Sequence, residues 1–127
     1  MRWRIDLPDS KPPLSLNQRG HWAVHDGDRK RLRQLAAWAA RAQKIPHCDH
    51  IFTRLVWQPP DNRRRDEDNI VLTAKPLWDG LVDAGVVDDD TSRFMTKMMP
   101  MILPGEKTAR VRVWLEIWEP RDRGVIE

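Results

Sequence analysis

The alternation of apolar and polar residues predicts the first strand and the first helix of the chain. Residues 2–7 alternate with a period of two, which is typical of a strand with one buried face. Residues 26–44 repeat apolar side chains at helical spacing, and Asp26 or Asp28 is placed to cap the start of this helix. Residues 9–20 contain prolines, serines, an asparagine and a glycine, which predict an ordered loop.

The same pattern predicts a second strand and a second helix in the middle of the chain. Residues 51–58 are rich in β-forming side chains and are followed by two prolines. Residues 69–84 again carry apolar side chains at helical spacing, and Gly85 is placed to cap the helix end. Pro76 lacks an amide donor and clashes with the preceding turn. We therefore expect a kink at Pro76, or a helix that begins near it.

Two further strands are predicted before the C-terminus. They cover residues 92–99 and residues 108–118, and the second alternates clearly between apolar and polar positions. Pro104 and Gly105 lie between them and predict a hairpin turn.

The order of these elements, β-α-β-α-β-β, predicts one α/β (α+β) domain. Its mixed sheet has about four strands packed with two main helices. The domain spans residues 1–120, and residues 121–127 form a polar C-terminal tail. A chain of 127 residues matches the usual size of one compact domain.

The composition says more about the compartment in which the protein works than about its function. The net charge of +3 is compatible with a polyanionic partner without requiring one. Cys48 is the only cysteine, so no intrachain disulfide can form, which is typical of a reducing compartment. The chain has no apolar run of signal-peptide or membrane-spanning length. We expect a soluble, cytoplasmic protein that does not interact with membranes.

Two aspartates before the second helix are candidate metal ligands. Asp66 and Asp68 are two residues apart, and in an extended segment their side chains point roughly the same way. Hard cations such as Mg²⁺ take carboxylate, water and phosphate oxygens as ligands. The alternative is that Asp68 caps the helix and its neighbours are solvated, because acidic residues favour helix starts.

A second acidic run and a lysine are candidates for the same site. Asp88, Asp89 and Asp90 follow Gly85, and one of them folding back beside the first pair would complete a metal site. Lys75 lies seven residues after Asp68, and hence on nearly the same helical face. A lysine there can neutralise charge on a phosphate. The alternatives are solvated loop acids and an ordinary surface ion pair between Lys75 and Asp79.

Basic residues lie next to the acidic segment and along the first helix. Arg63, Arg64 and Arg65 suit a clamp on the DNA backbone, because arginine pairs with phosphate through two parallel hydrogen bonds. Lys30 and Arg33 lie on the basic face of the first helix and are further candidates for DNA binding. The alternative is that the arginines only offset the local negative charge.

Other common kinds of site lack support in the sequence. The segment 47–50 contains two histidines, a cysteine and an aspartate, but their spacing matches no zinc pattern. No serine lies in a nucleophile elbow, and no glycine-rich phosphate loop is present. We therefore expect no small-molecule organic cofactor.

Taken together, the candidate segments resemble the RusA-type Holliday junction resolvases (crossover junction endodeoxyribonucleases) of phages and prophages. Three segments carry the resemblance: Arg63-Arg64-Arg65-Asp66-Glu67-Asp68-Asn69, Lys75-Pro-Leu-Trp-Asp79-Gly-Leu and Ala84-Gly85-Val-Val-Asp88-Asp89-Asp90. Asn17 and the pair His21-Trp22, ahead of the basic helix, also match the phage branch. The resemblance spans most of the chain and is most specific over residues 63–90.

This resemblance implies a homodimer that cuts four-way DNA junctions by paired nicking, with Mg²⁺ as cofactor and Mn²⁺ as a plausible substitute. It implies catalytic roles for Asp66, Asp68, Asp90 and Lys75, and a DNA-binding role for Asn17. The implied metal ligands are Asp66, Asp68, Asp89 and Asp90. In the best-known members the lysine follows the first aspartate by six residues, whereas here Lys75 follows Asp66 by nine. Three extra helical residues add about 4.5 Å of rise.

Three other functions remain open from the sequence. The first is a structure-selective nuclease for flaps or forks, which would use the same metal chemistry. The second is a catalytically silent protein that binds branched DNA with a steep salt dependence. The third is a phage structural or assembly protein whose charges only solvate its surface.

Overall fold

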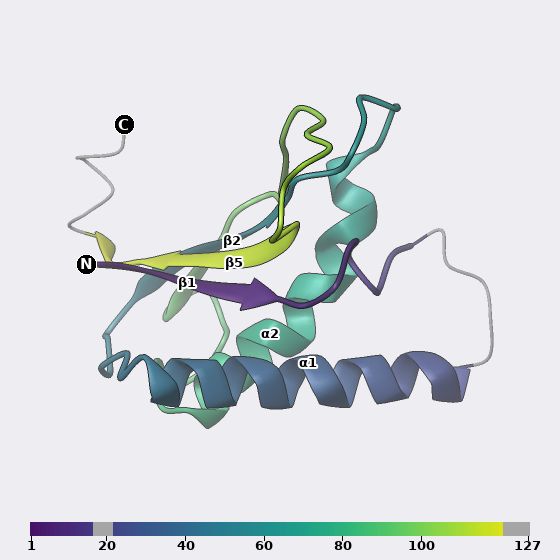
Figure 1. The fold of residues 1–127 in the computed structure, drawn as a ribbon. Helices are drawn as coiled ribbons and strands as arrows, with labels where there is room; N and C mark the ends of the chain where they lie inside the picture. The colour runs from purple at the N-terminus through teal and green to yellow at the C-terminus, as the bar shows by residue number, and fades with distance from the viewer. Residues whose placement is uncertain (17–21, 121–127) are drawn as a thin grey trace.

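The protein is a single α+β domain with one mixed sheet, as the sequence predicts (Figure 1). The computed structural model describes residues 1–16 and 22–120, and side chains are described from residue 25 after the gap. The sheet has five strands rather than four. The elements in chain order are β1 (Arg2–Leu7), α1 (Trp22–Ala42), β2 (Ile51–Trp57), the 3₁₀ turn η1 (Glu67–Ile70), α2 (Val71–Asp83), β3 (Met95–Lys97), β4 (Met101–Ile102) and β5 (Val113–Trp118).

The sheet order is β1-β5-β2-β3, with β4 pairing further along β2. Strand β5 is antiparallel to both of its neighbours, so Leu115 lies opposite Ile5 on one side and Leu55 on the other. Strands β3 and β4 both run parallel to β2, with Met95 opposite Ile51 and Met101 opposite Val56. The central strands β5 and β2 are therefore apolar along nearly their whole length.

The predicted hairpin at Pro104 and Gly105 is wrong. The last strands do not pair with each other, because β3 and β4 lie on one side of β2 and β5 lies on the other. The turn instead packs against the segment after β2, where the Gly105 amide donates to Asn62 Oδ1 at 2.7 Å. A Cβ at Gly105 would lie 2.4 Å from the carbonyl carbon of Asp61. Glycine is needed here for a close backbone approach rather than for a hairpin.

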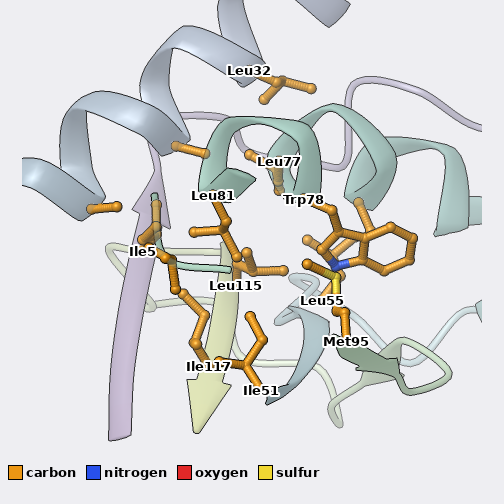
Figure 2. Close-up of a cluster of buried hydrophobic side chains, with 14 of the residues drawn as sticks. Ile5, Leu32, Ile51, Leu55, Leu77, Trp78, Leu81, Met95, Leu115 and Ile117 are labelled. Atoms are coloured by element: carbon orange, nitrogen blue, oxygen red, sulfur yellow. The ribbon is translucent and has the colours of Figure 1, made fainter. Parts of the chain in front are cut away.

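The main core lies between the sheet and the two helices (Figure 2). Helix α2 lies between α1 and the sheet. Its Leu77 and Leu81 face strand side chains such as Leu115. Leu32 of α1 packs on α2 from above in this view. These four leucines are completely buried. Burying a leucine side chain contributes on the order of 2 kcal/mol, so this layer fixes the position of α2.

The opposite face of the sheet is covered by arginines stacked on aromatic rings. Trp118 lies parallel to Phe52 at 6.0 Å between ring centroids. The Arg4 guanidinium lies 3.9 Å from the centroid of Trp114, and Arg54 packs over Trp118 while pairing with a glutamate of β5. The aliphatic stems of such arginines shield apolar surface while their charged ends stay wet. At least two of the seven tryptophans, Trp114 and Trp118, therefore have a packing role.

Helix α1 begins four residues earlier than predicted and ends two residues earlier. Asp26 and Asp28 do not cap it but pair with basic residues one turn later, with Asp26 3.4 Å from Lys30. Lys44 has a φ of 57°, which takes the chain out of the helix in the left-handed region. The two aspartates at the start of the apolar repeat therefore form ion pairs within the helix and do not mark its first turn.

Helix α2 begins at Val71 and continues through Pro76, so the prediction of a start near Pro76 is wrong. The 3₁₀ turn η1 leads directly into it, which places Pro76 in its second turn. A proline there removes one amide donor from an otherwise continuous helix. The predicted cap at Gly85 is confirmed: it has a φ of 78°, and the next amide, that of Val86, donates back to the carbonyl of Leu81 at 3.0 Å.

Neither helix, over the described part of the chain, is both long and apolar enough to cross a bilayer.

Candidate functional site

The arginine-rich connection before η1 is fixed by one of its own arginines. Arg65 donates to Asp61 Oδ1 at 2.7 Å and to the Asp61 carbonyl at 2.9 Å. Its guanidinium also lies 4.9 Å from the ring centroid of Trp57. Arg65 is thus largely committed to holding the segment, whereas Arg63 is highly exposed and only 3.6 Å from Asp61, and Arg64 is exposed. Only part of the predicted phosphate clamp is available to a ligand.

Asp66 and Asp68 are both exposed at the start of the α2 region. Asp66 is extended, with φ −105° and ψ 127°, but Asp68 belongs to the 3₁₀ turn. The premise that both lie in one extended segment is therefore wrong, because the chain begins to coil at Glu67. Neither aspartate makes a capping hydrogen bond from its side chain, either to η1 or to α2. The alternative of a simple helix cap finds no support in this geometry.

The three aspartates of the second acidic run have three different partners. Asp88 Oδ1 lies 2.9 Å from His47 Nε2. Asp89 Oδ1 accepts the backbone amide of Asp90 at 2.8 Å, which is a local turn contact. Asp90 is the only one of the three that turns towards α2. The run is therefore not a single cluster of equivalent carboxylates.

Asp90 and Lys75 meet although they are fifteen residues apart in the sequence. Lys75 Nζ lies 2.6 Å from Asp90 Oδ2 and 2.9 Å from Asp79 Oδ1. Lys97, at the end of β3, adds a second cation 3.2 Å from the same Asp90 oxygen. The ammonium of Lys97 also lies 4.8 Å from the ring centroid of Trp78, which holds it in place. The predicted surface pair of Lys75 with Asp79 is confirmed.

This arrangement keeps Asp90 ionised. The hydrogen bond from Lys75, reinforced by that from Lys97, lowers the pKa of Asp90 below its ordinary value, although partial burial opposes the shift. The same bond to Asp90 raises the pKa of Lys75. Asp90 has a side chain only 16% exposed, so solvent screens its two ion pairs less than a fully exposed pair.

A groove between α1 and α2 leads to Lys75. The residues that line it are Asp26, Arg29, Lys30, Arg33, Leu72, Lys75, Pro76 and Asp79. Lys30 is mostly exposed and has only a 3.4 Å pair with Asp26. Arg33, in contrast, donates twice to Asp83, at 2.6 and 2.9 Å, and so clamps α1 to the end of α2. The lining has four basic and two acidic side chains, but Lys30, Arg33 and Lys75 each pair with an aspartate.

The predicted metal ligands are not gathered into one set. Among residues 1–16 and 22–120, no group of three or more acidic, histidine or cysteine side chains lies close enough together to hold a metal ion. Asp90 is bound to lysines, and Asp66 and Asp68 lie near the start of α2. Carboxylates at Asp66 and Asp68 still have the donor chemistry for Mg²⁺, which typically takes one or two carboxylates, with water and substrate phosphate completing its shell.

The histidine- and cysteine-containing segment 47–50 is engaged in internal contacts. His50 Nδ1 lies 2.8 Å from the Arg93 carbonyl, and its Nε2 lies 2.7 Å from Thr96 Oγ1. Cys48 is buried, and burial together with its contact to Glu119 raises the pKa of its thiol to about 11. A protonated thiol and a histidine with both ring nitrogens occupied are poor metal ligands.

Two basic residues of the site were missed by the sequence analysis. Lys97 reaches Asp90 because β3 pairs with β2, and no local pattern indicates this pairing. Lys11 lies beside Asp66 because the loop after β1 packs on α2. The DNA-binding candidate Asn17, together with His21, lies outside the described residues, as does the predicted tail 121–127.

Comparison with known proteins adds no relative. No protein-family profile matches this sequence, and no curated protein matches it.

Proposed function

We propose that this protein is a metal-dependent endonuclease that nicks branched DNA, with the four-way junction as its substrate. The observation that supports this most is the contact of Lys75 with Asp90, at 2.6 Å between Nζ and Oδ2. Two segments that the resemblance to RusA-type resolvases singles out, far apart in the sequence, meet at one place. A purely solvated acidic run has no need of such a contact.

The surroundings of Lys75 suit a nucleic-acid substrate. The groove between α1 and α2 brings Lys30 and Arg29 near Lys75, and exposed arginines precede Asp66. Basic side chains such as these attract the phosphate backbone and release its counterions. Lys75 would then neutralise charge on the phosphate that reacts, while Asp90 fixes the position of its ammonium.

Mg²⁺ is proposed as the cofactor, with Mn²⁺ as a substitute. Asp66 and Asp68 would hold it as exposed carboxylates free of capping bonds, and the substrate phosphate would complete its shell. Bound Mg²⁺ supplies a nucleophilic water and stabilises charge on the phosphate. Lys75 and Lys97 compete with the cation for Asp90, so Asp90 would contribute only where these ion pairs give way. Asp89, which accepts the Asp90 amide, would be a further ligand.

The homodimer, the cytoplasmic location in a bacterial host and the phage or prophage origin belong to the same proposal. The homodimer, the bacterial host and the phage or prophage origin follow from the resemblance, whereas the cytoplasmic location follows from the single cysteine, Cys48. Two active sites related by a two-fold axis would match the symmetry of a four-way junction and give paired nicks.

One other function is favoured by a specific observation. The carboxylates are not gathered into a metal site over the described residues, whereas the cationic groove is formed. A protein that binds branched DNA without cutting it requires only the groove. This alternative predicts tight, salt-sensitive binding without nicked product.

The two functions are separated by replacing Asp68 with asparagine, which keeps the size of the side chain and removes its charge. We expect Asp68→Asn to lower the rate of Mg²⁺-dependent nicking of a synthetic junction by about 100-fold or more, as for loss of a group that stabilises the transition state. The measurement is a single-turnover nicking assay on denaturing gels. Asp49→Asn, at another exposed aspartate, is the control and should cut like the wild type. Undiminished cleavage by Asp68→Asn would contradict the proposed metal-dependent endonuclease.

A further inference from the structure

A cleft beside Asp66 combines unpaired cations with an apolar floor. We name it the Lys11 cleft; its lining residues are Lys11, Pro12, Ser15, Trp57, Arg64, Arg65, Asp66, Asn69 and Ile70. Its volume is about 400 Å³, within the range of small-ligand sites. A space of this size admits one nucleotide unit and excludes a double helix.

The cleft is held open by specific contacts between distant parts of the chain. Buried Thr73 of α2 accepts the Leu14 amide at 3.0 Å and donates to the Leu14 carbonyl at 2.7 Å. The Leu16 amide donates to the Asn69 carbonyl at 2.9 Å. These bonds fasten the loop that carries Lys11 to the start of α2. The cleft wall is thus a fixed feature of the fold.

The charges that face the cleft favour an anion. Lys11 and Arg64 are exposed, and neither makes a hydrogen bond or ion pair with another described residue. Arg65 is neutralised by Asp61 and serves as part of the wall. Asp66 is the one acidic side chain in the lining. Two available cations beside a carboxylate suit a phosphate group next to a metal ligand.

The floor of the cleft favours a base or a sugar next to that phosphate. Trp57, Pro12 and Ile70 present apolar surface, and every nucleobase has a flat face that packs on such surface. A second cleft shares Lys11, Trp57 and Arg65 with the first, and its lining also includes Asp61, Arg63 and Arg112. Lys11 therefore lines both hollows, so a strand that passes from one to the other would cross it.

From these features we infer that the Lys11 cleft binds one nucleotide of an unpaired DNA strand, with its phosphate on Lys11 and Arg64. This inference rests on the proposed function, because the cleft adjoins the proposed metal ligand Asp66. It adds Lys11 to the substrate-binding residues and assigns this surface to a single strand rather than to duplex. Branched DNA offers unpaired or unstacked nucleotides at its crossing point, so such a subsite would favour branched over linear substrates.

The test is equilibrium binding of a fluorescein-labelled oligothymidylate and of a linear duplex of equal length, in EDTA so that no cleavage intervenes. We expect Lys11→Gln to weaken oligothymidylate binding about three- to tenfold and to reduce the salt slope by about 0.7, the value for one phosphate contact on a single strand. The loss on duplex should be clearly smaller. Lys107→Gln, at an exposed lysine outside both clefts, is the control and should bind like the wild type.

The outcomes distinguish the subsite from the nuclease assignment. If Lys11→Gln and Lys107→Gln bind oligothymidylate equally well, while the wild type still nicks junctions, the subsite alone is overturned. An equal loss on duplex and single strand also overturns it, because Lys11 would then be a general backbone contact. If the wild type binds neither DNA but still nicks junctions, the subsite alone is overturned; if it nicks no junction either, the proposed function fails and the subsite fails with it.

Discussion

At the scale of single residues, the candidate site is built on two contacts of Lys75, one with Asp79 and one with Asp90. The spacing of four residues between Lys75 and Asp79 predicts an ion pair, and it forms at 2.9 Å. The contact of Lys75 with Asp90 has no local signature; their charges and the resemblance assign both to one site, but neither predicts this ion pair. Lys97 was missed because its position depends on how β3 pairs with β2. Sequence spacing within a helix fixes neighbours, whereas contacts across loops depend on the packed core.

The ion pairs of Asp90 predict a pH dependence. The pKa of Asp90 is lowered in the folded protein, first by its hydrogen bond from Lys75. Ionised Asp90 therefore stabilises the fold above the unfolded-state pKa of about 3.9, and this contribution is lost as the pH falls through the lower folded-state value. In Lys75→Met we expect the pKa of Asp90 to rise, because only Lys97 remains beside it.

This shift is measured by NMR titration of the Asp90 carboxyl carbon in metal-free buffer. Lys107→Met, which removes an exposed lysine outside this cluster, is the matched control and should leave the titration unchanged. An Asp90 titration that is the same in Lys75→Met as in the wild type would contradict the geometry described for this site.

At the scale of secondary-structure elements, periodicity predicted which segments form helices but not where they begin. Asp26 suggested a cap, yet α1 begins four residues before it at Trp22. Pro76 suggested a break, yet α2 continues through it because the apolar face of α2 is fully buried between α1 and the sheet. Gly85 was predicted correctly, since its role depends only on the local backbone conformation. Tertiary packing therefore decided where α1 begins and whether α2 continues through Pro76. The end of α2 followed its sequence signal, because Gly85 adopts a positive φ that glycine favours.

The close approach of the two helices gives a prediction at this scale. A Cβ at Gly80 of α2 would lie 2.4 Å from the Arg33 carbonyl oxygen and 2.7 Å from Ala36 Cβ. We expect Gly80→Ala to lower the free energy of unfolding by about 1–3 kcal/mol through overpacking, despite the better helix propensity of alanine. Urea unfolding measures this change.

Gly27 provides the matched control, because it also lies in a helix but has nothing within 4 Å of an added Cβ. Gly27→Ala should stabilise the protein by about 0.5–1 kcal/mol, the usual gain from replacing a helical glycine. If Gly80→Ala stabilised the fold as much as Gly27→Ala, the described packing of α1 on α2 would be wrong.

At the scale of the whole molecule, the class of fold was predictable and the pairing of its strands was not. Alternation identified β1 and β5, and β-forming composition identified β2, but neither signal carries information on which strands pair. Pro104 and Gly105 therefore predicted a hairpin where the chain instead packs its turn against Asp61. Strand β3, which follows the second acidic run, pairs with β2, and Asp90 at the end of that run contacts Lys75 of α2. The candidate site is a product of that topology as much as of its motifs.

The central claim is that this surface cuts branched DNA with the help of a metal ion. The most direct measurement incubates the wild-type protein with a synthetic four-way junction whose four strands are labelled one at a time, in Mg²⁺ and in EDTA. We expect paired nicks in two opposed strands in Mg²⁺, none in EDTA, and no cutting of linear duplex of the same sequence. Four intact strands in both Mg²⁺ and Mn²⁺, with the junction bound by folded protein, would contradict it.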